Sequence, residues 1–417
     1  YLYYNSEVSV TENGIHAGVF GLWMYSCDNI TIERNVYREE GSAVISYGNY
    51  ISTSENITFK KNTIDSIYRG LYGYKLKYSE MSYNDIGGCR DYGITLDSYS
   101  HHNTITRNDI YECQAEAIYL DAQTSYNAIV HNNFWYNNGT SDSYNSSRPQ
   151  AADFGSYNSW YDSAKDQGNF WADLTSPDND HDGIVDNPYN IGGSAGSNDA
   201  YPLTYRVRDI IKIESDDDFT SENGVIGGSG TSADPYIIER WHIDADGYDY
   251  GIYIANTTKY FVVKNCLVKN ADDIDIYIYN ASHGKVEFSI VRASTSTDSV
   301  KIEISSDVSI ENSYIKGYSL LSTVNHGIII QGSSNINIQS TEISQSYYGI
   351  MVYSSSDIFV ADVPINTFVD YGIYLYQVTS FTLSNVSVDN SDYSAIYLDH
   401  SSSGEISGGI MSNAGDH

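Results

Sequence analysis

The sequence predicts an all-β fold, a right-handed parallel β-helix in which three short strands form each turn and the turns stack. The first reason is a repeat, because Gly93-Ile-Thr-Leu-Asp97 returns 24 residues later as Ala117-Ile-Tyr-Leu-Asp121. A fixed period of this size is typical of stacked repeats. The second reason is alternation such as Thr104-Ile105-Thr106, the two-residue period of a strand with one buried face. The third is that no segment between the strands has the length or period of a helix.

The same frame continues along the chain. In the first half an asparagine ends one strand of each turn, at Asn35, Asn62, Asn84, Asn108 and Asn132. In the second half a G-I-x-x or A-I-x-x strand begins at Gly327, Gly349, Gly372 and Ala395. Asparagine tolerates left-handed backbone and its amide can bond along a stack, so these residues predict an asparagine column at one corner. A polar β-sandwich, the alternative, would not keep this register.

Size and charge narrow the class of protein. The chain has 417 residues and a formal charge of −32, which argues against nucleic acid and anionic lipid as partners. No apolar run is long enough to insert into a membrane. The first residues do not read as a signal peptide and the first residue is Tyr1, so we expect a maturation or fragment boundary there.

The repeat frame divides the chain into four parts. Residues 1–138 are predicted to form a first β-helix, and residues 139–210 an excursion loop followed by a closing module and linker. In residues 139–167 small polar residues dominate and the frame fails. Residues 211–250 are expected to cap a second β-helix, which runs over residues 251–417.

Three motifs in the middle of the chain are more specific. They are Gly168-Asn-Phe-Trp171, Pro177-Asp-Asn-Asp-His-Asp-Gly-Ile-Val-Asp-Asn-Pro-Tyr189 and Asn198-Asp-Ala-Tyr-Pro-Leu203. Their order resembles the closing segment of NosD-like β-helix domains, common in archaeal surface proteins. The stretch 224–239 resembles the opening of another such domain. The resemblance implies two tandem β-helices in a cell-surface protein.

The segment Asp178-Asn-Asp-His-Asp-Gly-Ile-Val-Asp186 predicts a Ca²⁺ site. Acids at positions 1, 3, 5 and 9, with glycine at position 6, match the first part of a calcium loop. The predicted ligands are Asp178, Asp180, Asp182, the Ile184 carbonyl and Asp186. Tyr189 replaces the bidentate glutamate at position 12, so the loop resembles dockerin-like or thrombospondin-like loops more than a full EF-hand. A further ligand such as Asp199 is possible, and a solvated acidic turn is the alternative.

Cysteines and sequons suggest an exported protein. Cys89 and Cys113 each follow a corner asparagine by five residues, so they should stack on adjacent coils about 4.8 Å apart, a spacing that suits a disulfide; two buried free thiols are the alternative. N-x-S/T sequons, candidate glycosylation sites, occur at Asn29, Asn56, Asn138, Asn145, Asn256, Asn280 and Asn385. Together with the acidic, tyrosine-rich composition they favour an extracellular or cell-surface protein.

Two columns of side chains are candidate sites. Lys77, Asp97 and Asp121 follow the G-I-x-L strand in apparent register, and carboxyls one coil apart would suit a polysaccharide-active enzyme. The alternative is that these aspartates only stabilise turns. In the second half Tyr353 aligns with Tyr376, and Tyr374 with Tyr397. Such rings could bind sugars, or could simply pack from coil to coil.

The function expected from the sequence is that of an extracellular structural or adhesive protein, stiffened by calcium and glycosylated, in a fibre, sheath or surface layer. The alternatives are a polysaccharide lyase, hydrolase or epimerase, and a carbohydrate-binding module, with glycans as partners. Both chain ends lie inside a coil pattern, and open coil edges invite pairing. We therefore expect either a longer polypeptide or self-association through the ends.

Overall fold

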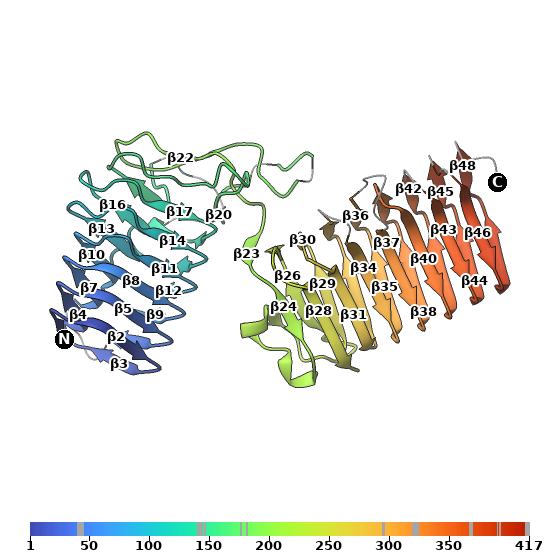
Figure 1. Ribbon diagram of the computed structural model, residues 1–417, viewed down its shortest axis with the longest axis horizontal. Coiled ribbons are helices and arrows are strands. Elements are labelled where there is room, and N and C mark those ends of the chain that lie inside the picture. The colour runs from blue at the N-terminus through green and yellow to red at the C-terminus, as the bar shows by residue number, and fades with distance from the viewer. Residues whose placement is uncertain are drawn as a thin grey trace. The chain divides into compact units, whose positions relative to one another are not determined.

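The computed structural model describes residues 1–39, 46–139, 145, 147–175, 177–180, 182–293, 297–318, 325–366, 370–389, 391 and 393–412. It consists of two compact units, Tyr1–Val207 and Arg208–His417, called unit 1 and unit 2 below. Each unit is a stack of coils in which three parallel sheets enclose an apolar interior (Figure 1). The predicted parallel β-solenoid is confirmed, and no α-helix occurs among the described residues.

Unit 1 contains three parallel sheets, called 1a, 1b and 1c. Sheet 1a contains β1 (Leu2–Tyr3), β4 (Phe20–Tyr25), β7 (Tyr47–Ser52), β10 (Arg69–Tyr74), β13 (Ile94–Asp97), β16 (Ile118–Leu120) and β19 (Ala151–Asp153). Sheet 1b contains β2 (Ser6–Thr11), β5 (Asp28–Glu33), β8 (Glu55–Lys60), β11 (Glu80–Ser82), β14 (Thr104–Thr106) and β17 (Ala128–Val130). Sheet 1c contains β3 (Gly14–Ala17), β6 (Val36–Glu39), β9 (Thr63–Asp65), β12 (Asp85–Gly87), β15 (Asp109–Tyr111), β18 (Asn133–Trp135) and β20 (Phe170–Trp171).

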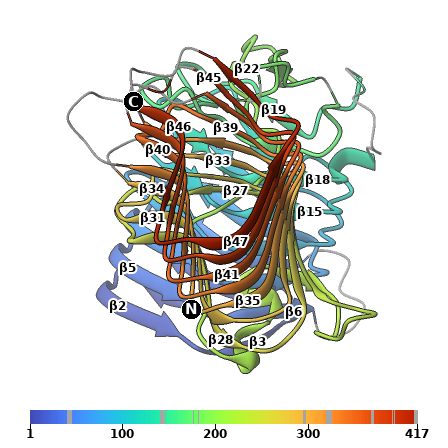
Figure 2. The same ribbon diagram turned by 90° about the vertical axis from the view of Figure 1, so that its right-hand side faces the viewer.

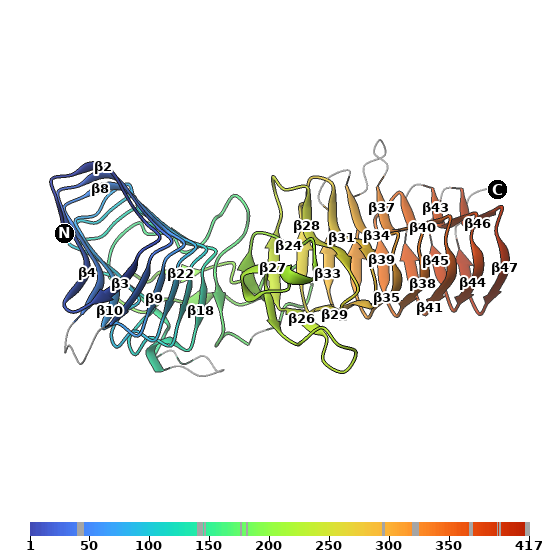
Figure 3. The same ribbon diagram turned by 90° about the horizontal axis from the view of Figure 1, so that it is seen from below.

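Unit 2 repeats this plan with sheets 2a, 2b and 2c (Figures 2 and 3). Sheet 2a contains β24 (Ile211–Ile213), β28 (Tyr250–Thr257), β31 (Ile274–Ala281), β34 (Asp298–Glu303), β37 (His326–Gln331), β40 (Tyr348–Tyr353), β43 (Tyr371–Tyr376) and β46 (Ser394–Asp399). Sheet 2b contains β25 (Val225–Gly227), β26 (Tyr236–Glu239), β29 (Phe261–Lys264), β32 (Gly284–Glu287), β35 (Ser306–Glu311), β38 (Ser334–Gln339), β41 (Ser356–Ala361), β44 (Thr379–Ser384) and β47 (Ser402–Ser407). Sheet 2c contains β23 (Arg206–Arg208), which includes the unit boundary, β27 (Trp241–Asp244), β30 (Leu267–Lys269), β33 (Ile290–Arg292), β36 (Tyr314–Lys316), β39 (Glu342–Ser344), β42 (Pro364–Asn366), β45 (Ser387–Asp389) and β48 (Ile410–Ser412).

A few elements depart from the coil plan. In the stretch that follows the last full coil of unit 1, β21 (Tyr189–Asn190) and β22 (Asn198–Asp199) form an antiparallel pair. In unit 2, β25 lies antiparallel to β26. Short 3₁₀ turns occur at η1 (Asn137–Gly139), η2 (Asp216–Asp218) and η3 (Ser221–Asn223). The predicted excursion rejoins the stack at β19, which pairs in parallel with β16.

The G-I-x-L pattern has a steric cause. The first residue of each such strand lies where one coil passes close to the next. A Cβ at Gly70 would be 2.4 Å from the carbonyl oxygen of Gly93, and one at Gly93 would be 2.7 Å from that of Ala117. The following apolar residues point inward and stack in register, as Leu71 does on Ile94. The small residue is therefore needed for the approach of two backbones, and the isoleucine for the core.

The corners of unit 1 are held by ladders of buried amides. The backbone N–H and the side-chain Nδ2 of each asparagine both donate to Oδ1 of the asparagine one coil later. For Asn84 these bonds to Asn108 are 3.0 and 2.8 Å long. This ladder runs through Asn13, Asn35, Asn62, Asn84, Asn108, Asn132 and Asn169. The predicted asparagine column is thus confirmed, and each of its rungs donates to the asparagine of the next coil.

Each ladder of unit 1 ends on a buried aspartate. Asn169 donates its backbone N–H to Asp199 Oδ2 at 2.7 Å. A second ladder runs from Asn103 through Asn127 to Asn158, which donates to Asp153 Oδ1 at 3.0 Å. A third passes from Asn137 to Gln150, which donates to Asp173 Oδ1 at 2.5 Å. Asp153, Asp173 and Asp199 are all buried. A carboxylate is suited to this position because it accepts bonds and has no N–H of its own to satisfy.

At the corner before sheet 2c, unit 2 uses hydroxyls where the equivalent corner of unit 1 uses amides. The backbone N–H of Ser289 donates to Oγ of Ser313, and that of Ser313 donates to Oγ1 of Thr341. The next residue in this column is Val363, because Ile343 pairs with Ile365. A valine has no polar side chain, so the ladder stops there. At this corner unit 2 therefore has a shorter ladder with fewer bonds per rung.

Candidate functional site

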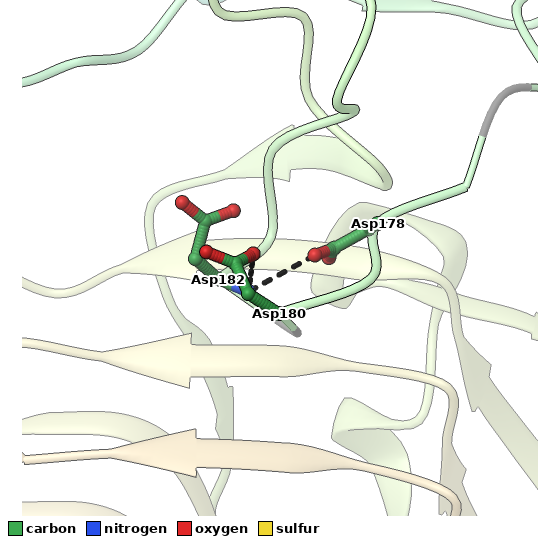
Figure 4. A group of neighbouring side chains, drawn as sticks. All are labelled: Asp178, Asp180 and Asp182. Atoms are coloured by element: carbon green, nitrogen blue, oxygen red, sulfur yellow. Dashed lines mark hydrogen bonds between the residues drawn. The ribbon is translucent and has the colours of Figure 1, made fainter.

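The predicted calcium loop brings three carboxylates together. Ligand oxygens of Asp178, Asp180 and Asp182 all lie within 4.8 Å of one another (Figure 4). The backbone holds this arrangement, since the N–H groups of Asp182 and Gly183 donate to the Asp178 carboxylate at 3.0 and 2.9 Å. Gly183 has a φ of +87°, the left-handed conformation that this turn requires and that glycine adopts freely.

These oxygens fit a hard cation. Carboxylate and carbonyl oxygens around a tight turn are what Ca²⁺ prefers, and three clustered negative charges repel one another when nothing neutralises them. Thr204 Oγ1 donates to Asp178 Oδ2 at 3.2 Å and ties the loop to the chain beyond it. His181 and Ser176 lie outside the described residues.

The other predicted ligands differ in their placement. Asp186 is not in the carboxylate cluster, and its Oδ2 accepts a hydrogen bond from Asn179 Nδ2. Ile184 donates its N–H to Asp182 Oδ1 at 2.8 Å. Asp199, suggested as a further ligand, is buried and accepts bonds from Asn169, Trp171 and Tyr201.

Two of the three residues predicted to form a column on sheet 1a are in register. Leu96 pairs with Leu120, so Asp97 and Asp121 follow in register on adjacent coils. Lys77 does not belong to this column, which corrects the register read from the sequence. The residue paired with Asp97 is Tyr74, and Lys77 pairs with Glu55 and His101. The error arose because Gly73-Tyr-Lys-Leu-Lys77 resembles Gly93-Ile-Thr-Leu-Asp97, whereas Leu71 pairs with Ile94 and the counterpart of Gly93 is Gly70.

Both aspartates of this column make structural hydrogen bonds. Asp97 accepts bonds from Tyr72 Oη and from Ser98 Oγ, the latter at 3.0 Å. Burial and the bond to Asp97 together raise the pKa of Tyr72 above its ordinary value. Asp121 accepts the backbone N–H of Gln123 at 3.3 Å. Lys77 therefore lies in another column than Asp97 and Asp121.

Tyrosines form the outer surface of sheets 1a and 2a. The predicted alignments of Tyr353 with Tyr376 and of Tyr374 with Tyr397 are confirmed. The rings of Tyr374 and Tyr397 stack with centroids 5.3 Å apart and planes 7° apart. Tyr50 and Tyr72 stack in the same way in unit 1, at 5.2 Å and 14°. Stacking uses the ring faces that a sugar would need, so these columns mainly present ring edges and hydroxyls.

A cluster on sheet 2a was not predicted from the sequence. Glu303 Oε2 accepts a bond from Lys301 Nζ at 2.8 Å and from Tyr277 Oη at 2.5 Å. One coil on, His326 Nδ1 lies 2.7 Å from Asp298 Oδ1. The signal was present, because β34 carries charged residues at positions where β40 and β43 carry tyrosine or methionine.

The ionisable groups of this cluster shift one another's pKa values. Burial would raise the pKa of Glu303, but bonds from Lys301 and Tyr277 outweigh it and the pKa is lowered. Burial and the hydrogen bond to Glu303 raise the pKa of Tyr277. Burial, followed by the nearby charge of Asp298, raises the pKa of Asp273. The cluster thus presents half-buried donors and acceptors side by side on the outer face of sheet 2a.

The cysteines lie where the register placed them, but as thiols. Cys89 and Cys113 are buried on adjacent coils, and all four cysteines of the chain are free. A hydrogen bond with Cys113, and then burial, raise the pKa of the Cys89 thiol well above its ordinary value. The structure thus contains the predicted neighbours without the predicted disulfide bond.

The sequon asparagines all reach the surface of their unit. Six of them are exposed and Asn138 is half-buried. Asn138 Nδ2 donates to the Pro149 carbonyl at 3.0 Å and to Glu116 Oε1 at 3.5 Å. No helix among the described residues is long and apolar enough to span a membrane.

Comparison with known proteins gives one family. The family model for the right-handed β-helix region matches residues 1–153 and 250–409. No curated protein matches the sequence.

Several solved structures are similar to the chain. The A-module of a mannuronan C-5 epimerase from Azotobacter vinelandii is 11% identical, with 92% of this chain and 90% of that chain covered and a TM-score of 0.27. Tailspike protein 2 from Escherichia coli O157:H7 bacteriophage CAB120 is 12% identical, with coverages of 84% and 38% and a TM-score of 0.32. The catalytic domain of a GH87 α-1,3-glucanase is 14% identical, with coverages of 96% and 64% and a TM-score of 0.27.

Proposed function

The chain belongs to the family of right-handed β-helix regions, and from that premise we propose that it is an extracellular structural or adhesive protein, stiffened by Ca²⁺ at the 178–182 loop and glycosylated. The observation that carries this proposal is the way polar side chains are used. The amides of unit 1 are engaged in ladders that end on Asp153, Asp173 and Asp199. Such chains of bonds strengthen one another in a low-dielectric interior and rigidify the stack.

The acidic column supports the same choice over catalysis. Asp97 is held by Tyr72 and Ser98, and Asp121 by a backbone N–H of its own turn. A catalytic pair needs carboxyls free to meet a substrate and a proton donor or acceptor positioned beside them. We expect no turnover of acidic or neutral polysaccharides with or without Ca²⁺. Turnover that disappears in the variant Asp97→Asn would refute the structural role.

Calcium is proposed to clamp the stretch after the last full coil of unit 1. The Asp178 carboxylate joins the loop to Thr204 through a hydrogen bond, so a cation there would fix two segments at once. Ligand binding to the folded state alone raises its stability, by roughly 3 kcal/mol at a hundredfold excess over Kd. Chelation should lower the melting temperature of the intact chain, and the variants Asp178→Asn and Asp182→Asn should abolish that response. An unchanged melting temperature would count against the site.

A glycan-binding face on sheet 2a is the second candidate function. The cluster of Lys301, Glu303, Tyr277, Asp298 and His326 combines charged hydrogen-bonding groups with aromatic edges. Affinity electrophoresis in gels containing neutral or acidic polysaccharides would test it. The expected result is retardation by one class, lost in Lys301→Met and kept in Lys212→Met, a variant of another lysine paired with a glutamate. Equal mobility in all gels would exclude this second function.

A further inference from the structure

Four of the seven sequon asparagines form two stacked pairs. Ala255 pairs with Tyr279 and Thr257 with Ala281, so Asn256 and Asn280 occupy one column on adjacent coils. In the same way Asp28 pairs with Glu55 and Ile30 with Ile57, which places Asn29 beside Asn56. The members of a pair are 27 and 24 residues apart, which is the repeat distance between their coils.

All four asparagines share one conformation at the coil corner. Their φ values are 53°, 55°, 53° and 45° for Asn29, Asn56, Asn256 and Asn280, and all four are exposed. The left-handed corner turns each side chain outward along the same edge of its unit. Each pair therefore presents two acceptor amides in the same direction.

In one pair the two amides are hydrogen-bonded to each other, and in the other pair one amide is bonded to the neighbour of its partner. Asn280 Nδ2 donates to Asn256 Oδ1 at 2.9 Å. Asn56 Nδ2 donates at 2.8 Å to Oδ1 of Asp28, the residue preceding Asn29. The two acceptor nitrogens of a pair are accordingly separated by about one coil spacing, about 4.8 Å.

From this geometry we infer that each pair carries at most one glycan in the folded protein, so that the four sequons provide two modification sites. The inference rests on the proposed glycosylation of this chain. In the reaction, C1 of the first sugar bonds to Nδ2, its bond to the pyrophosphate of a lipid-linked glycan donor breaks, and the amide proton leaves. A bulky branched glycan at one nitrogen covers the other.

Asn385 provides a matched single site. It has the same left-handed corner conformation, with φ of 52°, and is exposed. Its Nδ2 donates to Asp362 Oδ1 of the preceding coil at 3.1 Å, as Asn56 does to Asp28. The equivalent position on the next coil is Gly408, because Ser384 pairs with Ser407. No sequon lies beside Asn385 in this column, so its modification is unobstructed.

The test compares two full-length chains that each keep two sequons. One keeps Asn256 and Asn280, and the other keeps Asn280 and Asn385; the remaining sequons are removed by changing the serine or threonine, as in Thr31→Ala and Thr58→Ala. Both are produced in a host that glycosylates N-x-S/T sites, together with chains that keep a single sequon. Intact-protein mass of the protease-resistant, folded fraction then counts the glycans on each molecule.

In the chain that keeps Asn280 and Asn385, the fraction of molecules with two glycans should equal the product of the two single-site occupancies. The first chain should contain roughly tenfold fewer than that product, because one bulky glycan obstructs the other. Doubly modified, folded molecules at the full product in the first chain would overturn the inference and leave glycosylation itself intact. Single-sequon chains without any glycan would instead refute the proposed glycosylation, and the inference with it.

Discussion

Asn108 in unit 1 and Ser313 in unit 2 hold equivalent corners with very different numbers of bonds. The Asn108 side chain accepts from the backbone and side chain of Asn84, and donates to the carbonyls of Met81 and Thr106 and to Asn132 Oδ1. The Ser313 side chain accepts one backbone N–H, from Ser289, and donates to the Glu311 carbonyl. The same coil can therefore be closed by a dense or a sparse polar column.

The difference teaches that the apolar interior sets the fold while the corners set its stiffness. Both units stack isoleucine, leucine and valine in register inside. Among the described residues, carboxylate ends are found on the ladders of unit 1. We therefore expect perturbations of the ladder ends to have the largest effects, perturbations of single rungs to be intermediate, and perturbations of the outer faces to be small and equal in both units.

The largest effect is expected for Gly168→Ala. The added Cβ would lie 1.8 Å from Asp199 Oδ1, so the carboxylate must leave the end of the ladder and its buried donors lose their acceptor. The expected loss is about 4 kcal/mol in the free energy of unfolding, measured by urea denaturation. Gly14→Ala, where the new Cβ meets nothing within 4 Å, is the matched control. Equal stabilities of the two variants would contradict the role of Asp199.

The next effect is a dependence of stability on pH through Asp199. Burial raises the pKa of this carboxyl from 3.8 to about 6, in spite of the donors around it. A group whose pKa is higher in the folded state adds stability below its unfolded pKa, and that contribution is lost as pH rises through the folded pKa. The free energy of unfolding should fall by roughly 3 kcal/mol between pH 3 and pH 7, because each unit of difference between the folded and the unfolded pKa contributes about 1.4 kcal/mol. Titration of Asp199 followed by NMR would check the pKa, and a value near 4 would remove the expected slope.

An intermediate effect should separate the two kinds of ladder. Asn108→Ala leaves the donors of Asn84 and the acceptor of Asn132 unpaired inside the stack, and should cost about 3 kcal/mol. Ser313→Ala removes two weaker contacts and should cost about 1 kcal/mol. Urea unfolding of both variants measures the difference. Equal losses would mean that amide and hydroxyl corners are equivalent.

The smallest effect should be alike in both units. Tyr50→Leu and Tyr374→Leu each remove one ring from a stacked pair on an outer face. Aromatic pairs of this geometry contribute about 1 kcal/mol beyond the area they bury. Thermal melting should show similar small shifts for the two variants. If the melting temperature of one variant shifted several times more than that of the other, the outer faces would also contribute to the difference in stiffness between the two units.

Much of the stack could be predicted from the sequence because each coil repeats the constraint of the last. Gly93 and Ala117 mark the close approach of two backbones, and Asn84 and Asn108 mark one corner, so a single offset fixes the register of the core. Lys77 was misplaced because residues 73–77 resemble the repeat motif, whereas the counterpart of Gly93 is Gly70. An error in one turn moves only the side chains of that turn, so the rest of the register stayed correct.

The ladder ends could not be predicted because they come from segments outside the repeat. Asp153, Asp173 and Asp199 lie in the stretch after Asn138, where no period relates one residue to another. Asp199 was expected as a possible calcium ligand, since an aspartate near an acidic loop reads as such in sequence. The tight cluster of Asp178, Asp180 and Asp182 was visible because its spacing is local, whereas the stacking of Asn256 with Asn280 depends on the register of two coils.

The direction of the amide ladders has a consequence for how this chain is assembled. Every rung donates to the asparagine of the coil that comes next in the sequence, so a coil that has just formed exposes unsatisfied donors to the segment that a ribosome or export channel delivers next. The coils are therefore expected to be added to the stack in the order of synthesis, because each coil is the template for the next. The three buried carboxylates then end this process. They accept the last donors of the ladders in unit 1, so no donor of these ladders is left for a further coil.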